Sequence, residues 1–498
     1  MSAYLGVDIG TYESKGVLVG ADGEVIASAA RPHRMIVPQP GWAEHRAEED
    51  WWGDFVALTR ALIAESGVAP SDIKAVGASA IGPCLLPVDA AGAPLTNAIL
   101  YGVDTRAARE VDELPAAIGA PTIFDFCGNA LTSQSVGPKI LWLKRNRPDV
   151  WRRAHKFLGS TSFLVHRLTG RFVVDHYGAA NLGPLYMARE QVWSAALAPG
   201  IADLGRLPEI AWTTEIAGGV TPEAAAQTGL APGAPVIVGT IDAAAEAVSV
   251  GAVEAGDMML MYGSTIFTIL ITAARADDPR LWHAPWLFPG QYACMGGLAT
   301  SGALTHWFRD RFARELDPAA AMGMLAEEAG RAPPGARGLV MLPYFSGERT
   351  PIHDPRAKGV LFGLNLTHSR ADVYRALLEG IACATAQIID AYVEAGQAPR
   401  SIAAVGGGLR NPAWTQATSD VTGRSQTVRR LNIGACYGDA FLAALAIGDA
   451  RPDAMARWNP VVSRIEPNPA NAAVYRRQYG VFRDLYTRTA DLMARLDG

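Results

Sequence analysis

The order of predicted elements occurs twice in this chain, and this repetition restricts its fold more than any other feature. Each half begins with apolar strands in hairpin order, joined by short turns, and continues with a helix and a further strand. In the first half, strands are predicted at 4–9, 16–20, 24–29 and 73–78, with the helix at about 48–66. In the second half, strands are predicted at 258–262, 266–272, 292–295 and 339–342, with the helix at about 302–315. The repetition predicts two related α/β domains that face each other.

The junction between the two halves is predicted near residues 242–256. An apolar strand at 235–239 is followed there by an Ala-rich helix and then by Gly-Ala-Val-Glu-Ala-Gly. A chain of 498 residues is too long for one ordinary domain but fits two large ones. We therefore expect an N-terminal domain at 1–245 and a C-terminal domain at 246–498.

The charge balance and the cysteines exclude several classes of protein. The 44 Lys and Arg against 49 Asp and Glu give a net charge of −5, without the basic excess that nucleic-acid binding requires. Five scattered cysteines form no Cys-x-x-Cys pair, so we expect free, buried thiols in a reducing compartment.

The N-terminus lacks the features of a signal peptide. Gly-Ser-Thr interrupts the most apolar run of the chain, which fits buried strands better than a membrane span. We expect a cytoplasmic protein with no membrane or nucleic-acid partner.

The first turn carries residues suited to a phosphate group. A strand ends at Asp8, Gly10 and Thr11 form the turn, and Lys15 follows. Glycine lets backbone N–H groups approach an anion closely, and the threonine hydroxyl adds a donor. Asp8 is a candidate to hold Mg²⁺ through water, because Mg²⁺ often keeps several waters. An ordinary β-turn is the alternative, since Asp, Gly and Thr all favour turns.

A second turn, Gly263-Ser264-Thr265, occupies the corresponding place in the second half. It also joins two apolar strands and offers small hydrogen-bond donors. An ordinary turn is again the alternative. Two such turns that face each other across a cleft would hold a polyphosphate from both sides.

Three consecutive glycines, Gly406-Gly407-Gly408, lie between a predicted strand at 401–405 and a helix, and Asn411 follows them. Their bare backbone would let a flat ring such as adenine lie on the loop, and a flexible connection is the alternative. The loop is not the Gly-x-Gly-x-x-Gly fingerprint, and the chain has no Gly-x-x-x-x-Gly-Lys-Ser/Thr motif. Dinucleotide-dependent dehydrogenases and P-loop kinases are therefore disfavoured.

Asp242 lies between the strand at 235–239 and the predicted helix at 243–250. Open α/β sheets place their sites at the carboxyl ends of strands, so Asp242 is a candidate general base. A helix N-cap is the alternative, because Asp is favoured there. The sequence has no His-Glu-x-x-His pair and no Gly-x-Ser-x-Gly elbow, which leaves zinc and serine hydrolases without support.

Longer motifs follow one another in a fixed order along nearly the whole chain. In the first half they are Gly6-Val7-Asp8-Ile9-Gly10-Thr11, Pro40-Gly41-Trp42-Ala43-Glu44, Ala98 to Arg106, and Pro138 to Trp142. In the second half they are Tyr344 to Pro351, Gly359 to Gly380, and Gly406-Gly407-Gly408 with Asn411, Trp414 and Gln416. With this ordered set the chain resembles the FGGY family of carbohydrate kinases, of the sugar kinase/actin-like ATPase superfamily, and most of all its xylulokinase-like members.

The resemblance implies a fold, an activity and a set of site residues. The implied fold has two actin-like (ribonuclease H-like) α/β domains that face each other across a nucleotide and sugar cleft. The implied activity is transfer of the γ-phosphoryl group of ATP to a sugar or polyol hydroxyl with Mg²⁺, with Asp242 as the catalytic residue and Asp8 near the metal. The implied ATP-binding residues are Asp8, Gly10, Thr11, Lys15, Gly263, Ser264, Thr265, Gly302, His306, Gly406, Gly407, Gly408 and Asn411. The implied substrate-binding residues are Gly82, Pro83, Tyr101, Asp104 and Gln134.

Two departures from the family pattern leave the substrate open. Xylulokinases typically carry Met-His-Gly where this chain has Ile81-Gly82-Pro83-Cys84, and the second turn reads Gly-Ser-Thr instead of Gly-Thr-Ser. We expect a ketopentose, with D-xylulose first, and keep ribulose, a tetritol, a hexulose or glycerol as alternatives. A non-catalytic actin-like ATP-binding module is the alternative from another class, and the presence of Asp242 argues against it. The resemblance is also compatible with a homodimer.

Overall fold

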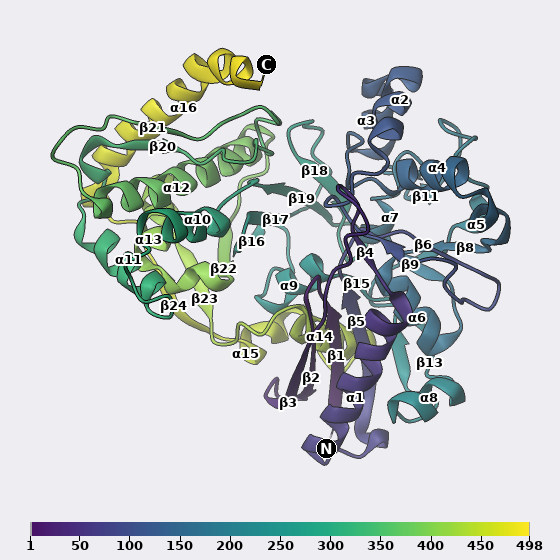
Figure 1. The fold of residues 1–498 in the computed structure, drawn as a ribbon. Coiled ribbons are helices and arrows are strands. Elements are labelled where there is room, and N and C mark those ends of the chain that lie inside the picture. The colour runs from purple at the N-terminus through teal and green to yellow at the C-terminus, as the bar shows by residue number, and fades with distance from the viewer. Residues whose placement is uncertain (1, 498) are drawn as a thin grey trace.

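Residues 2–497 are described by a computed structural model, in which the chain folds into two α/β domains (Figure 1). The N-terminal domain contains a seven-stranded sheet in the order β13-β14-β5-β1-β2-β3, with β15 paired to β5. Its strands are β1 (Ala3–Ile9), β2 (Glu13–Gly20), β3 (Val25–Pro32), β5 (Ile73–Ala80), β13 (Ile216–Gly219), β14 (Pro235–Ile237) and β15 (Thr240–Ile241). Strand β1 is antiparallel to β2 and parallel to β5.

The C-terminal domain repeats this arrangement with a sheet in the order β18-β19-β17-β16-β22-β23-β24. Its strands are β16 (Asp257–Tyr262), β17 (Ile266–Thr272), β18 (Trp282–Pro285), β19 (Tyr292–Gly297), β22 (Ser401–Val405), β23 (Gln426–Arg429) and β24 (Val461–Ile465). Strand β16 is antiparallel to β17 and parallel to β22, so these three correspond to β1, β2 and β5. The predicted repetition is confirmed.

One strand that was predicted as part of the repeat lies outside the main sheet. The strand predicted at 339–342 forms β20 (Val340–Leu342), but β20 pairs only with β21 (Val360–Phe362), outside the main sheet. The position beside β16 is occupied by β22 instead. A short apolar run predicts a buried strand but not its partner, because pairing depends on the packing of the whole sheet.

Helices surround the two sheets, and short strands complete the N-terminal half. The short strands are β4 (Glu44–His45), β6 (Leu86–Val88), β7 (Ala98–Ile99), β8 (Lys156–Leu158), β9 (Val173–Asp175), β10 (Tyr186–Met187), β11 (Val192–Trp193) and β12 (Glu209–Ala211). The helices of the first half are α1 (Gly53–Ser66), α2 (Ala108–Ile118), α3 (Ala120–Cys127), α4 (Val136–Asn146), α5 (Pro148–Arg153), α6 (Ser160–Thr169), α7 (His176–Ala179), α8 (Pro222–Thr228) and α9 (Asp242–Ser249). The helices of the second half are α10 (Gly302–Phe312), α11 (Ala321–Arg331), α12 (Arg370–Glu394), α13 (Pro412–Thr422), α14 (Ala435–Ala446), α15 (Met455–Trp458) and α16 (Ala472–Ala494).

Helices α9 and α14 lie side by side between the two sheets (Figure 1). Helix α14 comes from the second half of the chain but packs on β1 and β5 of the first sheet. A Cβ atom on Gly438 of α14 would lie 1.9 Å from Ala245 O of α9, and one on Gly6 of β1 would lie 1.9 Å from Cys436 O. The backbones therefore touch where these glycines stand, and this contact fixes the place of α9, which begins at Asp242.

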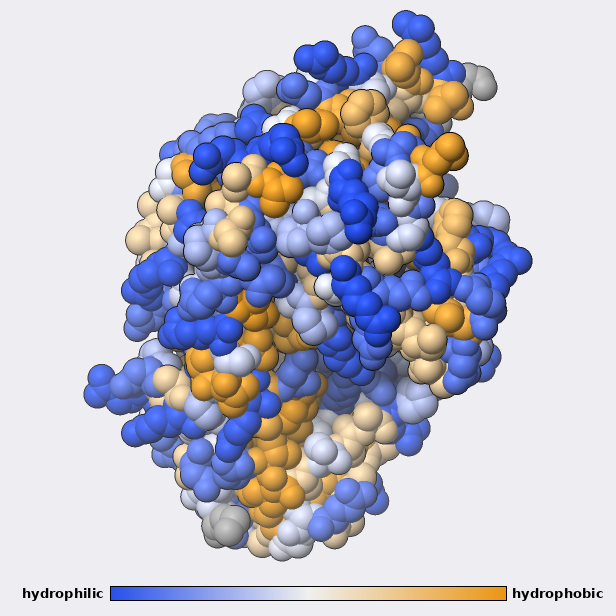
Figure 2. All heavy atoms as spheres, turned by 90° about the vertical axis from the view of Figure 1, so that its left-hand side faces the viewer, coloured by the Kyte–Doolittle hydropathy of each residue, from blue (hydrophilic) through white to orange (hydrophobic). Residues whose placement is uncertain are grey.

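The C-terminal domain is built around α12. By length and composition this helix could cross a membrane, but 83% of its most apolar window is buried inside the protein, which is the packing of a core helix. Ser369 and Asp372 form a capping box at its N-terminus. All five cysteines are buried and free, as predicted. Figure 2 shows a face on which hydrophilic residues dominate and apolar residues form separate patches.

Candidate active site

Asp242 is the first residue of α9, directly after β15, which pairs in parallel with β5. The helix-cap alternative does not hold, because the N-cap residue is Ile241. The side chain is half-buried, and its Oδ1 accepts a hydrogen bond from the N–H of Ala243 at 2.7 Å. Burial raises the pKa of Asp242 to about 7, and the charge of Glu246 adds to this effect against the Ala243 hydrogen bond. Such a carboxyl group can exchange a proton near neutral pH.

Three further carboxylates lie in the same part of the protein as Asp242. They are those of Asp8 in β1, Glu246 in α9 and Asp439 in α14. Ser79 Oγ donates to Asp439 Oδ2 at 2.7 Å and lies 3.4 Å from Asp8 Oδ1, so it joins the two elements. Burial raises the pKa of Asp8, and repulsion by Asp242, Asp439 and Glu246 raises it further. The excess of negative charge favours a cation at this point.

Asp439 carries no recognisable motif and is absent from the predicted site residues. Its side chain is fully buried, and within residues 2–497 its Oδ1 has no hydrogen-bond partner. Burial is the main reason why its pKa is raised. A lone carboxylate in the apolar run 435–446 is the sequence signal that could have identified it, because such groups are rarely buried without a partner.

The first turn brings several predicted residues together. Gly10 N–H donates to Glu13 O at 3.1 Å, which closes the turn, and a Cβ at Gly10 would lie 2.7 Å from that same oxygen. Lys15 stands opposite Asp8 in the β1–β2 pair and lowers the pKa of that carboxyl group. The turn, the carboxylate and the lysine thus lie together at the end of the β1–β2 hairpin.

A cavity of about 590 Å³ lies between the second turn and the glycine loop, within the usual range for ligand pockets. The predicted ATP-binding residues that line it are Gly263, Ser264, Gly302, His306, Gly407, Gly408 and Asn411. The start of α10 supports the turn, because Gly302 N–H donates to Gly263 O and Ala303 N–H donates to Ser264 O, each at 3.0 Å. Thr265 stands just outside the lining.

Gly406 also lies outside this lining, for a clear packing reason. Its φ is 101°, and a Cβ there would lie 2.7 Å from Tyr262 O at the end of β16. Asn411 has two roles, since it lines the cavity and its side chain caps α13 by accepting from Trp414 N–H at 3.3 Å. The three glycines therefore divide into one that permits close packing and two that border the cavity.

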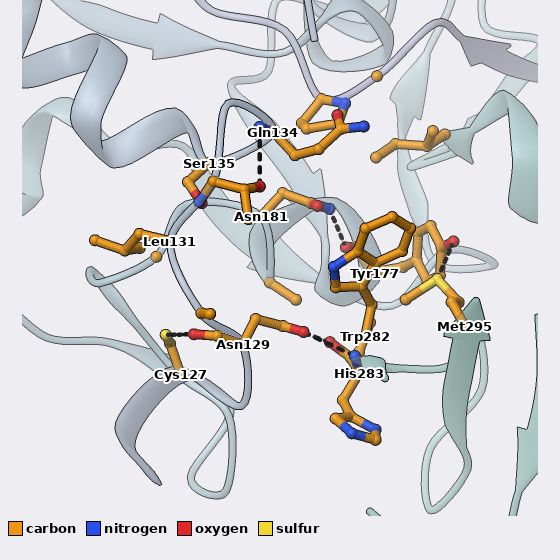
Figure 3. A pocket seen from close by; sticks show the side chains of 18 of the residues that line it. Cys127, Asn129, Leu131, Gln134, Ser135, Tyr177, Asn181, Trp282, His283 and Met295 are labelled. Carbon is orange, nitrogen blue, oxygen red and sulfur yellow. Dashed lines mark hydrogen bonds between the residues drawn. The ribbon is translucent and has the colours of Figure 1, made fainter. Parts of the chain in front are cut away.

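A second cavity, of about 120 Å³, lies between the domains next to Asp242, whose neighbours Ile241 and Ala243 line it. The predicted substrate residues that line it are Gly82, Pro83 and Gln134. Figure 3 shows Trp282 of β18 and Met295 of β19, from the C-terminal domain, together with Gln134 and Asn181 of the N-terminal domain. The cavity is therefore walled by both domains.

Two contacts join the domains at this cavity, and neither is predicted from the sequence. Asn129 Nδ2 donates to His283 O at 2.7 Å, and His283 N–H donates to Asn129 Oδ1 at 2.8 Å, as in a strand pair (Figure 3). Tyr177 O–H donates to Met295 Sδ at 2.9 Å. Each pair joins residues more than a hundred positions apart, so no local pattern could have identified them.

The last two predicted substrate residues lie elsewhere. The hydroxyl of Tyr101 lies 3.4 Å from Thr11 Oγ1, so Tyr101 is next to the first turn. Asp104 does not line the cavity, because its carboxylate is fully buried, pairs with Arg106 at 2.7 Å and accepts from Ala43 N–H at 2.7 Å. A buried carboxylate with these partners orders its own loop, and we leave Asp104 out of the proposed sugar-binding set.

The chain is similar to known proteins along nearly its whole length. The sequence models of the N-terminal and C-terminal domains of the FGGY family of carbohydrate kinases match residues 3–249 and 258–447. The xylulose kinase of Escherichia coli (strain K12) is 31% identical over 503 residues, which cover 99% of this chain and 100% of that relative. The gluconokinase of Bacillus subtilis (strain 168) is 26% identical over 513 residues, which cover 99% of this chain and 98% of the relative.

The fold agrees with these matches. The crystal structure of xylulose kinase from Rhodospirillum rubrum superposes with a TM-score of 0.93 at 33% identity, covering 99% of this chain and 100% of the other. The family's enzymes are ATP-dependent phosphotransferases that act on sugar hydroxyls, and the two facing actin-like domains are its fold. This chain therefore belongs to the FGGY family of carbohydrate kinases.

Proposed function

We propose that this kinase phosphorylates a hydroxyl group of a ketopentose, with D-xylulose as the first candidate, and that Asp242 is its general base. The position of Asp242 carries the proposal, because a half-buried carboxylate at the start of α9 lies between Ile241 and Ala243, which line the interdomain cavity. Relatives named xylulose kinase over the whole length of the chain support the substrate class.

The proposed reaction is a direct transfer. Asp242 orients the sugar hydroxyl and accepts its proton while the new O–P bond forms and the bond to ADP breaks. The first turn, through Thr11, and the second turn, through Ser264, supply donors to the γ-phosphate oxygens from opposite sides. The cavity beside Gly407 and Gly408 receives the adenosine. The arrangement positions the reactants and neutralises charge, which is what phosphoryl transfer requires of a protein.

The carboxylates beside Asp242 fit Mg²⁺. Asp8 of β1 lies near three further acidic side chains, those of Asp242, Glu246 and Asp439, and Lys15 offsets part of this charge. No group of three His, Cys, Asp or Glu side chains in the described part of the chain forms a cage for a metal. This suits Mg²⁺, which keeps several waters and binds through one or two carboxylates and the phosphates of the substrate. We propose that Asp8 holds the ion through water; when bound, Mg²⁺ offsets the negative charge of the phosphates.

We expect kcat/KM to rise with pH through about pH 7 and then to level off. Only the ionised carboxylate of Asp242 accepts a proton, and its pKa is raised to about 7 by burial and by the charge of Glu246. The activity is therefore present above this pKa and is lost as the pH falls through it. The measurement is kcat/KM for the sugar between about pH 5 and about pH 9 at constant ionic strength. Full activity at the acidic end would contradict the assignment of Asp242.

The lining of the interdomain cavity favours a neutral sugar over a sugar acid. Gluconokinases are among the relatives, but no Lys or Arg in the described chain lines this cavity. His283 is the lining side chain that could carry a positive charge, and burial lowers its pKa. A bound carboxylate would therefore lose its water without gaining a cationic partner.

A panel of acceptors tests the proposal. We expect ADP release, followed with coupling enzymes, to depend on added sugar and to be fastest with D-xylulose. Gluconate is expected to react at least about a hundredfold more slowly, because its charge is not paired. D-Ribulose, a hexulose, a tetritol and glycerol complete the panel. A different best acceptor would overturn the assignment of D-xylulose, and ATP-binding protein that releases no ADP with any acceptor would overturn the kinase activity of this chain.

A further inference from the structure

Two histidines lie behind the first turn and hold three consecutive carbonyl groups. His33 Nε2 is 3.0 Å from Gly10 O, and His45 Nε2 is 3.1 Å from Thr11 O. The backbone N–H of His33 also donates to Tyr12 O at 2.9 Å. The two rings meet edge to face, with centroids 5.0 Å apart and an interplanar angle of 87°. The turn that we assign to the phosphate is therefore tied from behind at each of these peptide groups.

The partner of His45 fixes its tautomer. Trp51 Nε1 lies 3.0 Å from His45 Nδ1, and an indole N–H can only donate. His45 Nδ1 is therefore an acceptor, and the single proton of the neutral ring is on Nε2, which donates to Thr11 O. Burial, followed by the charge of His33, lowers the pKa of His45 to about 4, so it stays neutral at physiological pH. The ring is fully buried, so water does not compete for these two hydrogen bonds.

The partners of His33 require it to be charged. Its Nδ1 lies 3.0 Å from Asp54 Oδ2 and its Nε2 faces Gly10 O, so both ring nitrogens must carry protons. Burial opposes the charge, but the hydrogen bond and the charge of Asp54 outweigh it and raise the pKa of His33. Arg31 Nε and Ser14 Oγ donate to the same carboxylate at 2.9 and 2.8 Å and hold it in place. Gly10 O thus receives a charge-assisted hydrogen bond.

These hydrogen bonds determine where the N–H groups of the turn point. In a trans peptide the carbonyl of one residue and the N–H of the next point in opposite directions. The N–H groups of Thr11 and Tyr12 are therefore directed away from the two histidines. In the part of the chain that the structure describes, neither of them donates to a protein group. Adjacent free N–H groups on one side of a turn are the donors with which a backbone binds an anion.

We infer that His33 and His45 are positioning residues that hold the first turn so that the N–H groups of Thr11 and Tyr12 face the γ-phosphate of ATP. The inference rests on the proposed function of the turn. Neither histidine touches the substrates; each acts through a carbonyl group on the far side of the peptide plane. Loss of either is expected to weaken contacts to the γ-phosphate and to leave the adenosine cavity, which belongs to the other domain, unchanged.

The test compares affinities for ADP and for a non-hydrolysable ATP analogue, measured with Mg²⁺ by calorimetry on the full chain. For His45→Leu we expect analogue affinity and kcat to fall about tenfold or more, with ADP affinity within about twofold of the wild type. His45→Gln offers an amide oxygen to Trp51 and an amide N–H to Thr11 O. It is therefore expected to keep analogue affinity and kcat within about threefold of the wild type. His33→Leu is an independent second variant with the same expected change in the ratio of the two affinities.

His166→Leu is the matched control. His166 of α6 is partly buried, as His33 is, and its ring stacks on that of Phe172 with centroids 4.1 Å apart, but its Nε2 faces Ala91 O instead of the turn. The His166→Leu variant is expected to keep the wild-type ratio of analogue affinity to ADP affinity. Equal losses of analogue and ADP affinity in both His45→Leu and His33→Leu, or no loss in either, would overturn the inference. Absence of sugar-dependent ADP release in the wild type would instead overturn the proposed function, so the two failures are distinguishable.

Discussion

Asp242→Asn is expected to lower kcat by at least about a thousandfold and to leave the affinities for ATP and sugar nearly unchanged. The amide has the shape of the carboxylate but cannot accept the hydroxyl proton. The variant therefore loses an interaction that is needed only while the phosphoryl group moves. Turnover is measured as ADP release at saturating substrates, and the two affinities are measured by calorimetry.

The stability of this variant separates loss of the base from loss of the fold. Glu246 repels the charge of Asp242, and Asp242 repels that of Asp8, so removal of the charge is not expected to lower the unfolding temperature. Asp310→Asn, the same change at an exposed position of α10, is the control and is expected to keep kcat within about twofold. If Asp242→Asn keeps more than about a tenth of the wild-type kcat, Asp242 is not the base.

Gly438→Ala is expected to cause the largest loss of stability. The new Cβ would lie 1.9 Å from Ala245 O and 2.8 Å from Ala245 C, and these backbone atoms cannot rotate away. Helices α14 and α9 must separate, at a cost of more than about 2 kcal/mol, which lowers the unfolding temperature by about 5 °C or more. Because α9 carries Asp242 at its start, we also expect kcat to fall about tenfold or more.

Gly480→Ala is the control for this prediction. Gly480 lies in α16 with no heavy atom within 4 Å of the site of a new Cβ, so the same substitution meets open space there. It is expected to stabilise the helix by up to about 1 kcal/mol, because alanine favours helices more than glycine does. Thermal unfolding of both variants is the measurement. A Gly438→Ala protein as stable as Gly480→Ala would show that the backbones of α14 and α9 do not touch at Gly438.

The parts of the site with a local chemical signature were predictable from the sequence. A turn such as Gly263-Ser264-Thr265 has its own backbone requirement and its own donors, so its place between two strands follows from the residues alone. The loop Gly406-Gly407-Gly408 was predictable for the same reason. The repeated order of strands also gave the architecture, because hairpins and parallel neighbours are set by short-range patterns.

The contacts that join the two domains at the interdomain cavity were not predictable in this way. Asn129 and His283 pair across the cavity although they are 154 positions apart, and nothing near either residue indicates the other. The prediction that Asp104 binds the substrate was wrong for a different reason. The motif near Tyr101 determines where Asp104 lies but not where its side chain points. Arg106 pairs with the carboxylate and holds it within its own loop. Asp439 escaped notice because an apolar helix around one carboxylate has no recognised motif.

The division of the chain at 245 and 246 remains a prediction. Packing does not follow it strictly, because α14 belongs to the second half in sequence and to the first sheet in space. The chain passes from the first sheet to the second after α9, returns to the first sheet at α14, and joins the second sheet again at β24.

A crystal structure of the complex with Mg²⁺, a non-hydrolysable ATP analogue and D-xylulose tests the proposed role of Asp242 most directly. We expect one sugar hydroxyl about 2.6–3.2 Å from an oxygen of Asp242 and in line with the γ-phosphorus, which lies between the turns at Gly10-Thr11 and Gly263-Ser264. A sugar bound away from Asp242, or a γ-phosphate that contacts neither turn, would contradict it.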